Sequence, residues 1–159
     1  MLLTFEFLQW CWKKLNKKSA PGVDKVTAYQ YNVNLNDNIA NLVESVKGGW
    51  YRAKLILRRF IPKLGGKLRP LGIPATSDKL LQMAVTSILN AIFESIFLTC
   101  SFGYRPNIGA KDAIRELSFQ LQYCGYNYIV EADIKGFFDN ISFQWMLDNI
   151  PMDKEILNK

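Results

Sequence analysis

The stretch from residue 55 to residue 73 constrains the fold most, because its pattern fits one element closely. Residues 55–63 are rich in strand formers, residues 64–67 read Leu-Gly-Gly-Lys, and residues 68–73 return to strand formers. Two such runs around a glycine-rich turn predict a β-hairpin. Prolines occur at positions 62, 70 and 74. Since proline cannot donate to a strand ladder, we expect this hairpin to project from the body of the protein.

Cationic side chains crowd the predicted hairpin, and they are Arg58, Arg59, Lys63, Lys67 and Arg69. Alternate residues of a strand share a face, which places Arg59 with Lys63 and puts Arg58 on the opposite side. Several cations on one hairpin suit a clamp for a triphosphate or for a nucleic-acid backbone. The alternative interpretation is a solvated edge hairpin on which charge prevents aggregation.

Charge is unevenly distributed along the chain. The net charge is +6 and the pI is about 9.2. Residues 47–79 hold nine basic residues and one acidic residue, a local charge of +8, whereas residues 130–159 hold three basic and six acidic residues, a local charge of −3. A basic balance favours polyanionic partners, and a basic wall beside an acidic patch suits nucleotide chemistry with a divalent metal. Ordinary solvated charge on a globular domain is the alternative.

Missing residue types exclude several kinds of site. The sequence has no His, which excludes His-ligated metals and the Ser–His and Cys–His pairs of nucleophilic catalysis. Its three Cys residues lie far apart and show no Cys-x-x-Cys spacing, so we expect neither a zinc site nor a disulfide framework. This cysteine usage favours a reducing, cytoplasmic location.

The length of 159 residues suits one domain, and 49% of the residues are hydrophobic, enough for a sizeable core. Periodicity and turn signals predict helices over residues 3–15, 29–46, 79–97, 110–122 and 143–149. We expect Ser77 or Asp78 to cap the third helix and Ser142 to cap the last. The third helix is apolar around most of its circumference, which predicts deep burial, and its polar interruptions argue against a membrane span. The apolar N-terminus lacks the features of a signal peptide.

Residues 128–133 read Tyr-Ile-Val-Glu-Ala-Asp, which predicts a strand that ends in the carboxylate of Asp133. A carboxylate exposed at a strand end is a good ligand for Mg²⁺, which prefers oxygen donors. The aromatic pair Phe137 and Phe138 follows, and an aromatic ring near a metal-bound nucleotide can support its sugar. The alternative is that Asp133 is a turn residue and that both Phe side chains belong to the core.

Four stretches of this sequence together resemble a known family. They read SAPGVDKVT, IPKLGGKLRPLGIPATSDKLLQMAV, SFGYRPNIGAKDAI and VEADIKGFFDNIS, and they lie in this order within residues 19–142. In these motifs the chain resembles the reverse transcriptases (intron maturases) encoded by group II introns. The resemblance implies an α+β fold, namely a partial right-hand polymerase. Residues 1–125 would be the fingers region, and residues 126–159 would be the start of the palm.

The resemblance also implies roles around the acidic motif. Asp133 would be the first metal-binding aspartate of the palm and would hold Mg²⁺ with the Ile134 backbone carbonyl. Phe138 would lie under the sugar of the incoming deoxynucleotide and exclude a 2′-hydroxyl. For Asp139 we expect a structural role.

On the hairpin, the resemblance implies that Lys63 and Arg69 hold the triphosphate. Arg58 and Arg59 are weaker candidates for contacts with the nucleotide or the template. Residues 71–74 would support the templating base.

The sequence departs from the family in two respects. Lys111 stands where the family usually has His, and no Tyr-x-Asp-Asp motif follows Asp133. Two-metal phosphoryl transfer needs two ions about 3.5–4 Å apart that several carboxylates clamp, so one aspartate cannot hold both. We therefore expect that this 159-residue polypeptide alone does not polymerise DNA.

The partners implied by the resemblance are intron RNA as template, a DNA primer and deoxynucleoside triphosphates, with no membrane. An unpaired strand at residues 129–133 would leave an open edge, which predicts self-association, for example as a homodimer. The alternative function is a non-catalytic module that binds intron RNA and assists splicing.

Overall fold

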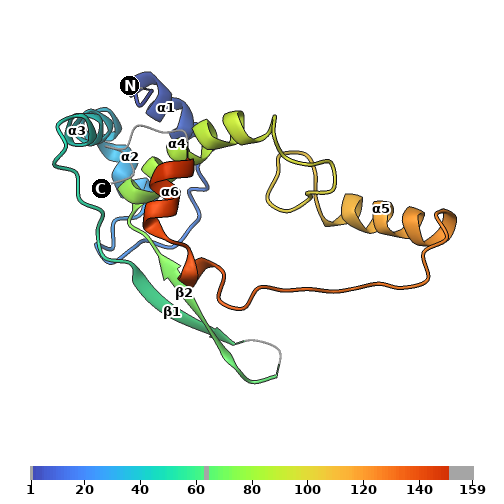
Figure 1. Ribbon diagram of the computed structural model, residues 1–159. Coiled ribbons are helices and arrows are strands. Elements are labelled where there is room, and N and C mark those ends of the chain that lie inside the picture. Colours follow the sequence, from blue (N-terminus) through green and yellow to red (C-terminus); the bar gives the residue numbers. More distant parts are fainter. Residues whose placement is uncertain (1, 63–64, 151–159) are drawn as a thin grey trace. The chain divides into compact units, whose positions relative to one another are not determined.

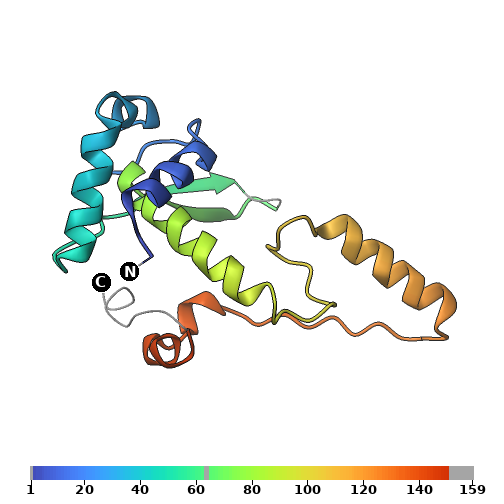
Figure 2. The same cartoon turned by 90° about the horizontal axis from the view of Figure 1, so that it is seen from above.

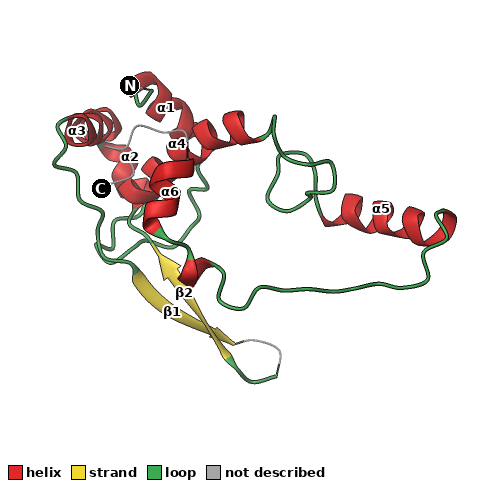
Figure 3. Cartoon of the chain, in the orientation of Figure 1, coloured by secondary structure: helices red, strands yellow, loops and turns green. Residues whose placement is uncertain are grey.

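The computed structural model describes residues 2–62 and 65–150 (Figure 1). The chain divides into two units, residues 2–87 and residues 88–150, and the boundary lies within helix α4 (Thr76–Phe93). The described part combines helices with one two-stranded antiparallel sheet (Figure 3). The sequence-based expectation of a mixed helix-and-strand protein is confirmed at this level.

Three helices and the first turns of α4 build the core of the first unit. They are α1 (Phe5–Lys14), α2 (Ala28–Val33) and α3 (Leu35–Lys47), and both α1 and α2 pack against α3. Their shared interior contains Leu3, Leu8, Cys11, Trp12, Tyr31, Ile39, Leu42, Val43, Val46, Ala75, Leu80 and Ala84. Each large aliphatic side chain buried there contributes about 1.5–3 kcal/mol. This helical core forms the base from which the hairpin extends.

The single helix predicted over residues 29–46 is wrong, because the chain breaks at Asn34. Asn34 has φ −116° and ψ 46°, so it ends α2 and precedes α3. The Asn38 side chain donates to the Tyr31 carbonyl at 2.8 Å, where α2 ends. Asn side chains compete with the helix backbone for hydrogen bonds in this way, which periodicity alone does not register.

The predicted hairpin is confirmed. Strand β1 (Leu57–Pro62) pairs antiparallel with β2 (Leu68–Ile73), and Arg59 lies opposite Leu71. Both strands are largely exposed and extend away from the helices of the first unit (Figure 1). Seen from above, the hairpin therefore lies beyond α1 (Figure 2). Gly65 and Gly66 both have positive φ, at +90° and +76°, a conformation that glycine adopts without a Cβ penalty. A sheet of two strands has only edges, which is where proline is tolerated.

Helix α4 differs from the prediction at its start and in its burial. It begins at Thr76, so neither Ser77 nor Asp78 caps it, and Asp78 lies within the first turn. Only Thr76, Asp78, Leu80 and Ala84 are buried, so the prediction of deep burial along the whole helix is wrong. The apolar residues of its later turns are only partly covered. In the part of the chain that the structure describes, no helix combines the length and the hydropathy needed to cross a membrane.

The second unit contains the end of α4, helix α5 (Ala110–Tyr123), the 3₁₀ turn η1 (Phe138–Asn140) and helix α6 (Phe143–Asn149). Both α-helices confirm the predicted bounds to within one residue. Ser142 caps α6 as predicted, since its Oγ accepts a hydrogen bond from the Trp145 N–H at 3.3 Å. No residue of α5 or α6 is buried.

The strand predicted at residues 128–133 is wrong for this structure. Residues 125–134 have no regular secondary structure, and Tyr128 and Val130 are each 90% exposed. A strand requires a hydrogen-bonded neighbour, and among the described residues the only ladder is the one between β1 and β2. The apolar pattern of this segment therefore lacks the partner that would turn it into a strand.

Candidate functional site

The hairpin sorts its cations by face. Directly opposed residues of an antiparallel pair lie on the same face, as do alternate residues of one strand. Arg59 opposes Leu71, and Arg69 opposes Ile61, so Arg59 and Arg69 share one face. Arg58 opposes Gly72 and lies on the other face. All three arginines are exposed, which leaves their charge available to a polyanion.

The register confirms the predicted separation of Arg58 from Arg59. Arg59 accompanies Arg69, the predicted triphosphate ligand, whereas Arg58 does not. Lys63 lies outside the described residues, so its predicted role stays a prediction. Lys67 follows the turn and is exposed.

Residues of the acidic motif line one open hollow in the second unit. Its lining includes Asp133, Ile134, Phe137, Phe138 and Asp139. The structure thus brings together the predicted metal ligand, the residue that offers its carbonyl and the predicted sugar platform. Asp133 and Asp139 are both exposed here.

A tight turn presents the two aromatic side chains of this hollow. Gly136 has φ +64°, and its carbonyl accepts from the Asn140 side chain at 2.7 Å, which closes the turn into η1. Phe137 and Phe138 meet edge to face with their ring centroids 5.3 Å apart. Phe138 is 81% exposed and Phe137 is 49% exposed, so the alternative that both belong to a core is wrong.

The oxygen ligands at this hollow are of the kind that a hard metal ion prefers, but they are too few to hold one. Mg²⁺ prefers oxygen ligands such as the Asp133 carboxylate. Among residues 2–62 and 65–150, no group of three acidic, His or Cys side chains lies close enough to hold a metal ion. A pair of metal ions needs several carboxylates. The described residues therefore supply at most one part of such a site.

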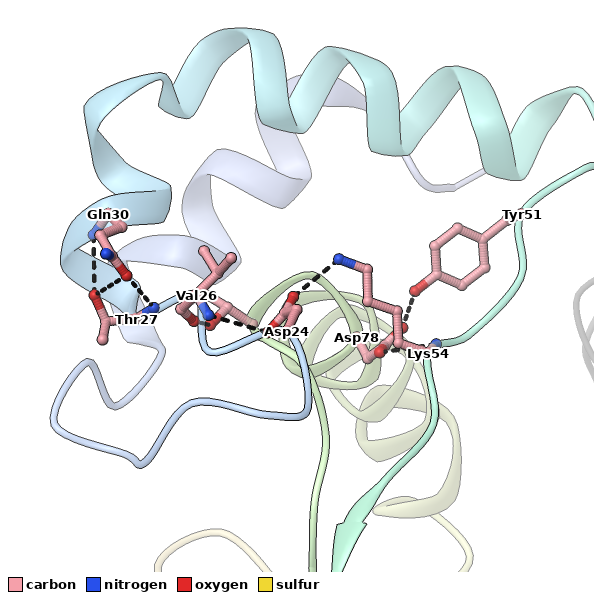
Figure 4. A network of polar contacts seen from close by, with 8 residues as sticks. Asp24, Val26, Thr27, Gln30, Tyr51, Lys54 and Asp78 are labelled. Atoms are coloured by element: carbon pink, nitrogen blue, oxygen red, sulfur yellow. Dashed lines mark hydrogen bonds and ion pairs between the residues drawn. The ribbon is translucent and has the colours of Figure 1, made fainter.

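A polar network at the base of the hairpin was not predicted as part of the site (Figure 4). The buried carboxylate of Asp78 accepts hydrogen bonds from the Tyr51 hydroxyl and from the Lys54 N–H. Burial, followed by the hydrogen bond to Asp78, raises the pKa of Tyr51 well above its ordinary value, so the hydroxyl remains a donor. The only sequence signal was that Asp78 is the one acidic residue among the nine cations of residues 47–79.

An ion pair extends this network to the loop before α2. The Lys54 ammonium lies 2.9 Å from an oxygen of Asp24, which also accepts from the Val26 N–H at 3.1 Å. Burial acts to raise the pKa of Asp24, but these hydrogen bonds outweigh it and hold that pKa below its ordinary value. Asp24 belongs to the SAPGVDKVT motif, so this motif contacts the segment that leads into the hairpin.

Arg105 organises the loop that carries the FGYRP motif in the second unit. Its guanidinium donates to both oxygens of Glu94 and to the carbonyls of Leu98 and Ser101. The hydrogen bond to Glu94 raises the pKa of Arg105 further. The arginine of this motif therefore stabilises the loop from within.

A comparison with known families decides what kind of protein carries this arrangement. A family described as reverse transcriptase (RNA-dependent DNA polymerase) matches residues 61–152, which is more than half of the chain. The chain belongs to the reverse transcriptase family. The matched range contains Arg69 and the whole acidic motif, and it begins two residues after Arg59.

Individual relatives agree with the resemblance to intron-encoded reverse transcriptases. The chain is 40% identical over 106 residues to the group II intron-encoded protein LtrA of Lactococcus lactis subsp. cremoris, which covers 66% of this chain and 17% of that protein. It is 36% identical over 138 residues to protein YkfC of Escherichia coli (strain K12), which covers 84% of this chain and 36% of that protein. A putative COX1/OXI3 intron 1 protein of Saccharomyces cerevisiae is 34% identical over 90 residues, which covers 57% of this chain and 11% of that protein.

This reverse-transcriptase chain is therefore shorter than the curated relatives that it matches. It spans about a third of the length of YkfC and about a sixth of the length of LtrA. The predicted identity as part of a group II intron type reverse transcriptase or maturase is confirmed.

Proposed function

We propose that these residues form the fingers and the start of the palm of a polymerase that adds deoxynucleotides to a DNA primer on an RNA template. Residues 1–125 would be the fingers region, and residues 126–159 would begin the palm. The partners would be intron RNA, the primer and deoxynucleoside triphosphates, in the cytoplasm. Family membership supports this reading, together with the exposed cationic hairpin and the exposed acidic motif.

The side chains would have different roles in binding the nucleotide and the template. Arg69, with Lys63, would hold the triphosphate of the incoming deoxynucleotide, because guanidinium groups pair well with phosphate oxygens. Arg59 would assist from the same face of the hairpin. Residues 71–74 would support the templating base. Phe138 would lie under the sugar and exclude a 2′-hydroxyl.

Asp133, with the Ile134 carbonyl, would contribute oxygen ligands for Mg²⁺. When bound, this ion would stabilise the negative charge that develops during phosphoryl transfer. Among the described residues, no group of three acidic, His or Cys side chains completes such a site.

The grouping of Arg59 with Arg69 on one exposed hairpin face is the observation that carries this proposal. A primer-extension assay tests its catalytic part. The purified 159-residue chain, given a primed RNA template, Mg²⁺ and deoxynucleotides, should show no extension above background. Extension by this chain would mean that Asp133 does not depend on further carboxylates, which would contradict the roles assigned here.

A second function, binding of intron RNA without catalysis, is favoured by the same hairpin. Its exposed cations can contact a phosphate backbone without any metal. RNA binding measured in the absence of metal separates the two functions. Arg69→Ala and Lys63→Ala should weaken binding, whereas Asp133→Ala should leave it unchanged. Equal weakening by Asp133→Ala would argue against a separate RNA-binding role for the hairpin.

A further inference from the structure

The hairpin has two legs, residues 51–56 before β1 and residues 74–75 after β2. Both legs meet at the first turn of α4. Strand β2 ends at Ile73 and continues through two residues, Pro74 and Ala75, into the helix. The leg before β1 does not run directly into α4, because the whole hairpin lies between them in the chain. It is joined there by Asp78, whose two carboxylate oxygens accept from the Tyr51 hydroxyl and, at 3.2 Å, from the Lys54 N–H. One side chain of α4 thus closes the base of the hairpin.

The SAPGVDKVT loop crosses both legs and reinforces this closure (Figure 4). On the β2 side, Gly22 lies so close to Pro74 and Ala75 that a Cβ atom there would come within 2.6 Å of backbone atoms. On the β1 side, Asp24 pairs with the Lys54 ammonium at 2.9 Å. The loop is also tied to α4.

Two side chains of α4 make these ties to the loop. The Thr76 hydroxyl donates to the Val26 carbonyl at 2.6 Å, and the Lys79 ammonium donates to the Ser19 hydroxyl at 3.2 Å and to the Ala20 carbonyl. Loop, helix and both legs of the hairpin therefore form one hydrogen-bonded assembly within the first unit.

An acidic side chain suits the position of Asp78 for a specific reason. The residue is only 4% exposed, so its oxygens need partners from the protein. A carboxylate offers two accepting oxygens, and both are used here. In Asp78→Asn the amide oxygen can still accept from the Lys54 N–H, and its NH₂ group can donate to the Tyr51 hydroxyl oxygen, so that variant can keep both contacts. Asp78→Leu has a side chain of similar shape but no acceptor, so it loses both hydrogen bonds.

We propose that Asp78 is a positioning residue, which fixes the hairpin relative to α4 so that Arg59 and Arg69 are held ready for a polyanion. Arg59 lies five residues beyond Lys54, and Arg69 is paired with the same strand through Ile61, so freedom at this base becomes movement of both cations. Holding charged groups in place before binding reduces the entropy that binding must overcome. The functional half of this assignment rests on the proposed binding role of the hairpin.

Whether Asp78 fixes the position of the hairpin can be measured without any ligand. Spin labels at Lys47→Cys on α3 and Phe60→Cys on β1 report the distance between helix and hairpin by pulsed electron paramagnetic resonance. The exposed Cys100 and Cys124 are replaced by Ser, and the fully buried Cys11 is kept. Asp78→Leu and Tyr51→Phe should each broaden the distance distribution. An unchanged distribution in Asp78→Leu would overturn the assignment.

The control for this measurement is a variant that loses stability elsewhere in the same unit. Leu8→Ala removes a fully buried side chain of α1 that takes no part in the network. It should lower the melting temperature but leave the distance distribution narrow at temperatures well below melting. If Leu8→Ala broadens the distribution as much as Asp78→Leu does, the effect is general loosening, and Asp78 has no special role.

A double-mutant cycle on RNA affinity tests whether Asp78 aids binding by positioning Arg59 and Arg69. Asp78→Leu should weaken RNA binding by about 2- to 10-fold, a loss of the size that one net hydrogen bond contributes. In the Arg59→Ala/Arg69→Ala background the same change should cause no further loss, because no positioned cations remain. An equal loss in both backgrounds would overturn the assignment. If RNA affinity does not depend on Arg59 and Arg69 at all, the proposed function fails, and the distance distributions alone decide the role of Asp78.

Discussion

Because Gly22 has no side chain, its loop can approach the connection between β2 and α4 closely. A Cβ atom at this position would lie 2.6 Å from backbone atoms of Ala75, which cannot move as the end of a flexible side chain can. We predict that Gly22→Ala lowers the free energy of unfolding by about 1–3 kcal/mol, the usual cost of overpacking. Urea denaturation measures this loss. Gly103→Ala is the matched control, because nothing lies within 4 Å of its added Cβ, and it should change stability little.

Asp24 should give the protein a small acid-sensitive component of stability. Its pKa in the folded protein is lower than in the unfolded chain, so its contribution is present above the unfolded pKa, near 3.8, and is lost as the pH falls through the folded pKa. Its partner Lys54 has a side chain that is 50% exposed, so the pair contributes only about 0.5 kcal/mol.

The corresponding test compares Asp24→Asn with the unchanged protein. Between pH 6 and pH 3, the free energy of unfolding of the unchanged protein should fall further, by about 0.5 kcal/mol, than that of the variant. Parallel pH profiles for the two proteins would show that the ion pair contributes nothing measurable.

The hairpin should bind nucleic acid mainly through one of its faces. Arg59 and Arg69 share a face, and Arg58 lies on the other. We predict that Arg59→Ala and Arg69→Ala each weaken RNA binding more than Arg58→Ala does. Fluorescence anisotropy with a single-stranded RNA at one fixed salt concentration measures the three affinities. Equal losses for all three variants would indicate that only the net charge of the hairpin matters.

Elements whose structure depends on nearby residues were predicted well. The hairpin follows from Gly65 and Gly66 between two strand-forming runs, and α6 follows from the Ser142 cap. The break at Asn34 was missed because the side chain of Asn38 satisfies the end of α2, and periodicity does not reveal such a bond. The strand at residues 128–133 was predicted wrongly for a different reason, since it has the residue pattern of a strand but the described residues provide no neighbouring strand.

In the candidate site too, contacts between residues close in sequence could be predicted, whereas contacts between distant residues could not. Asp133, Ile134 and Phe138 are close in sequence, so one turn at Gly136 suffices to bring them to one hollow. The network of Asp78 joins residues that are 24 or more positions apart, and no local pattern encodes that pairing. Helix-capping rules assigned Asp78 a role at the start of α4 only.

The described part of the protein exposes a large amount of apolar surface in its second unit. On α5, Ile114, Leu117, Phe119 and Tyr123 are exposed, and beyond it Tyr128, Ile129 and Val130 are exposed as well. Apolar surface of this extent favours association. We predict that the 159-residue chain self-associates as its concentration rises, which multi-angle light scattering measures. A monomer at all concentrations would contradict the proposed self-association through this region.

The salt dependence of RNA binding tests most directly whether this member of the reverse transcriptase family grips nucleic acid with its hairpin. Each phosphate contact with single-stranded RNA should contribute a slope of about −0.7 to a plot of log affinity against log salt concentration. We predict a steep slope without metal, reduced by about 1.4 in Arg59→Ala/Arg69→Ala, as expected for two lost contacts, and unchanged in Asp133→Ala. A flat salt dependence, or the same slope in the double arginine variant, would contradict a hairpin that holds the phosphate backbone.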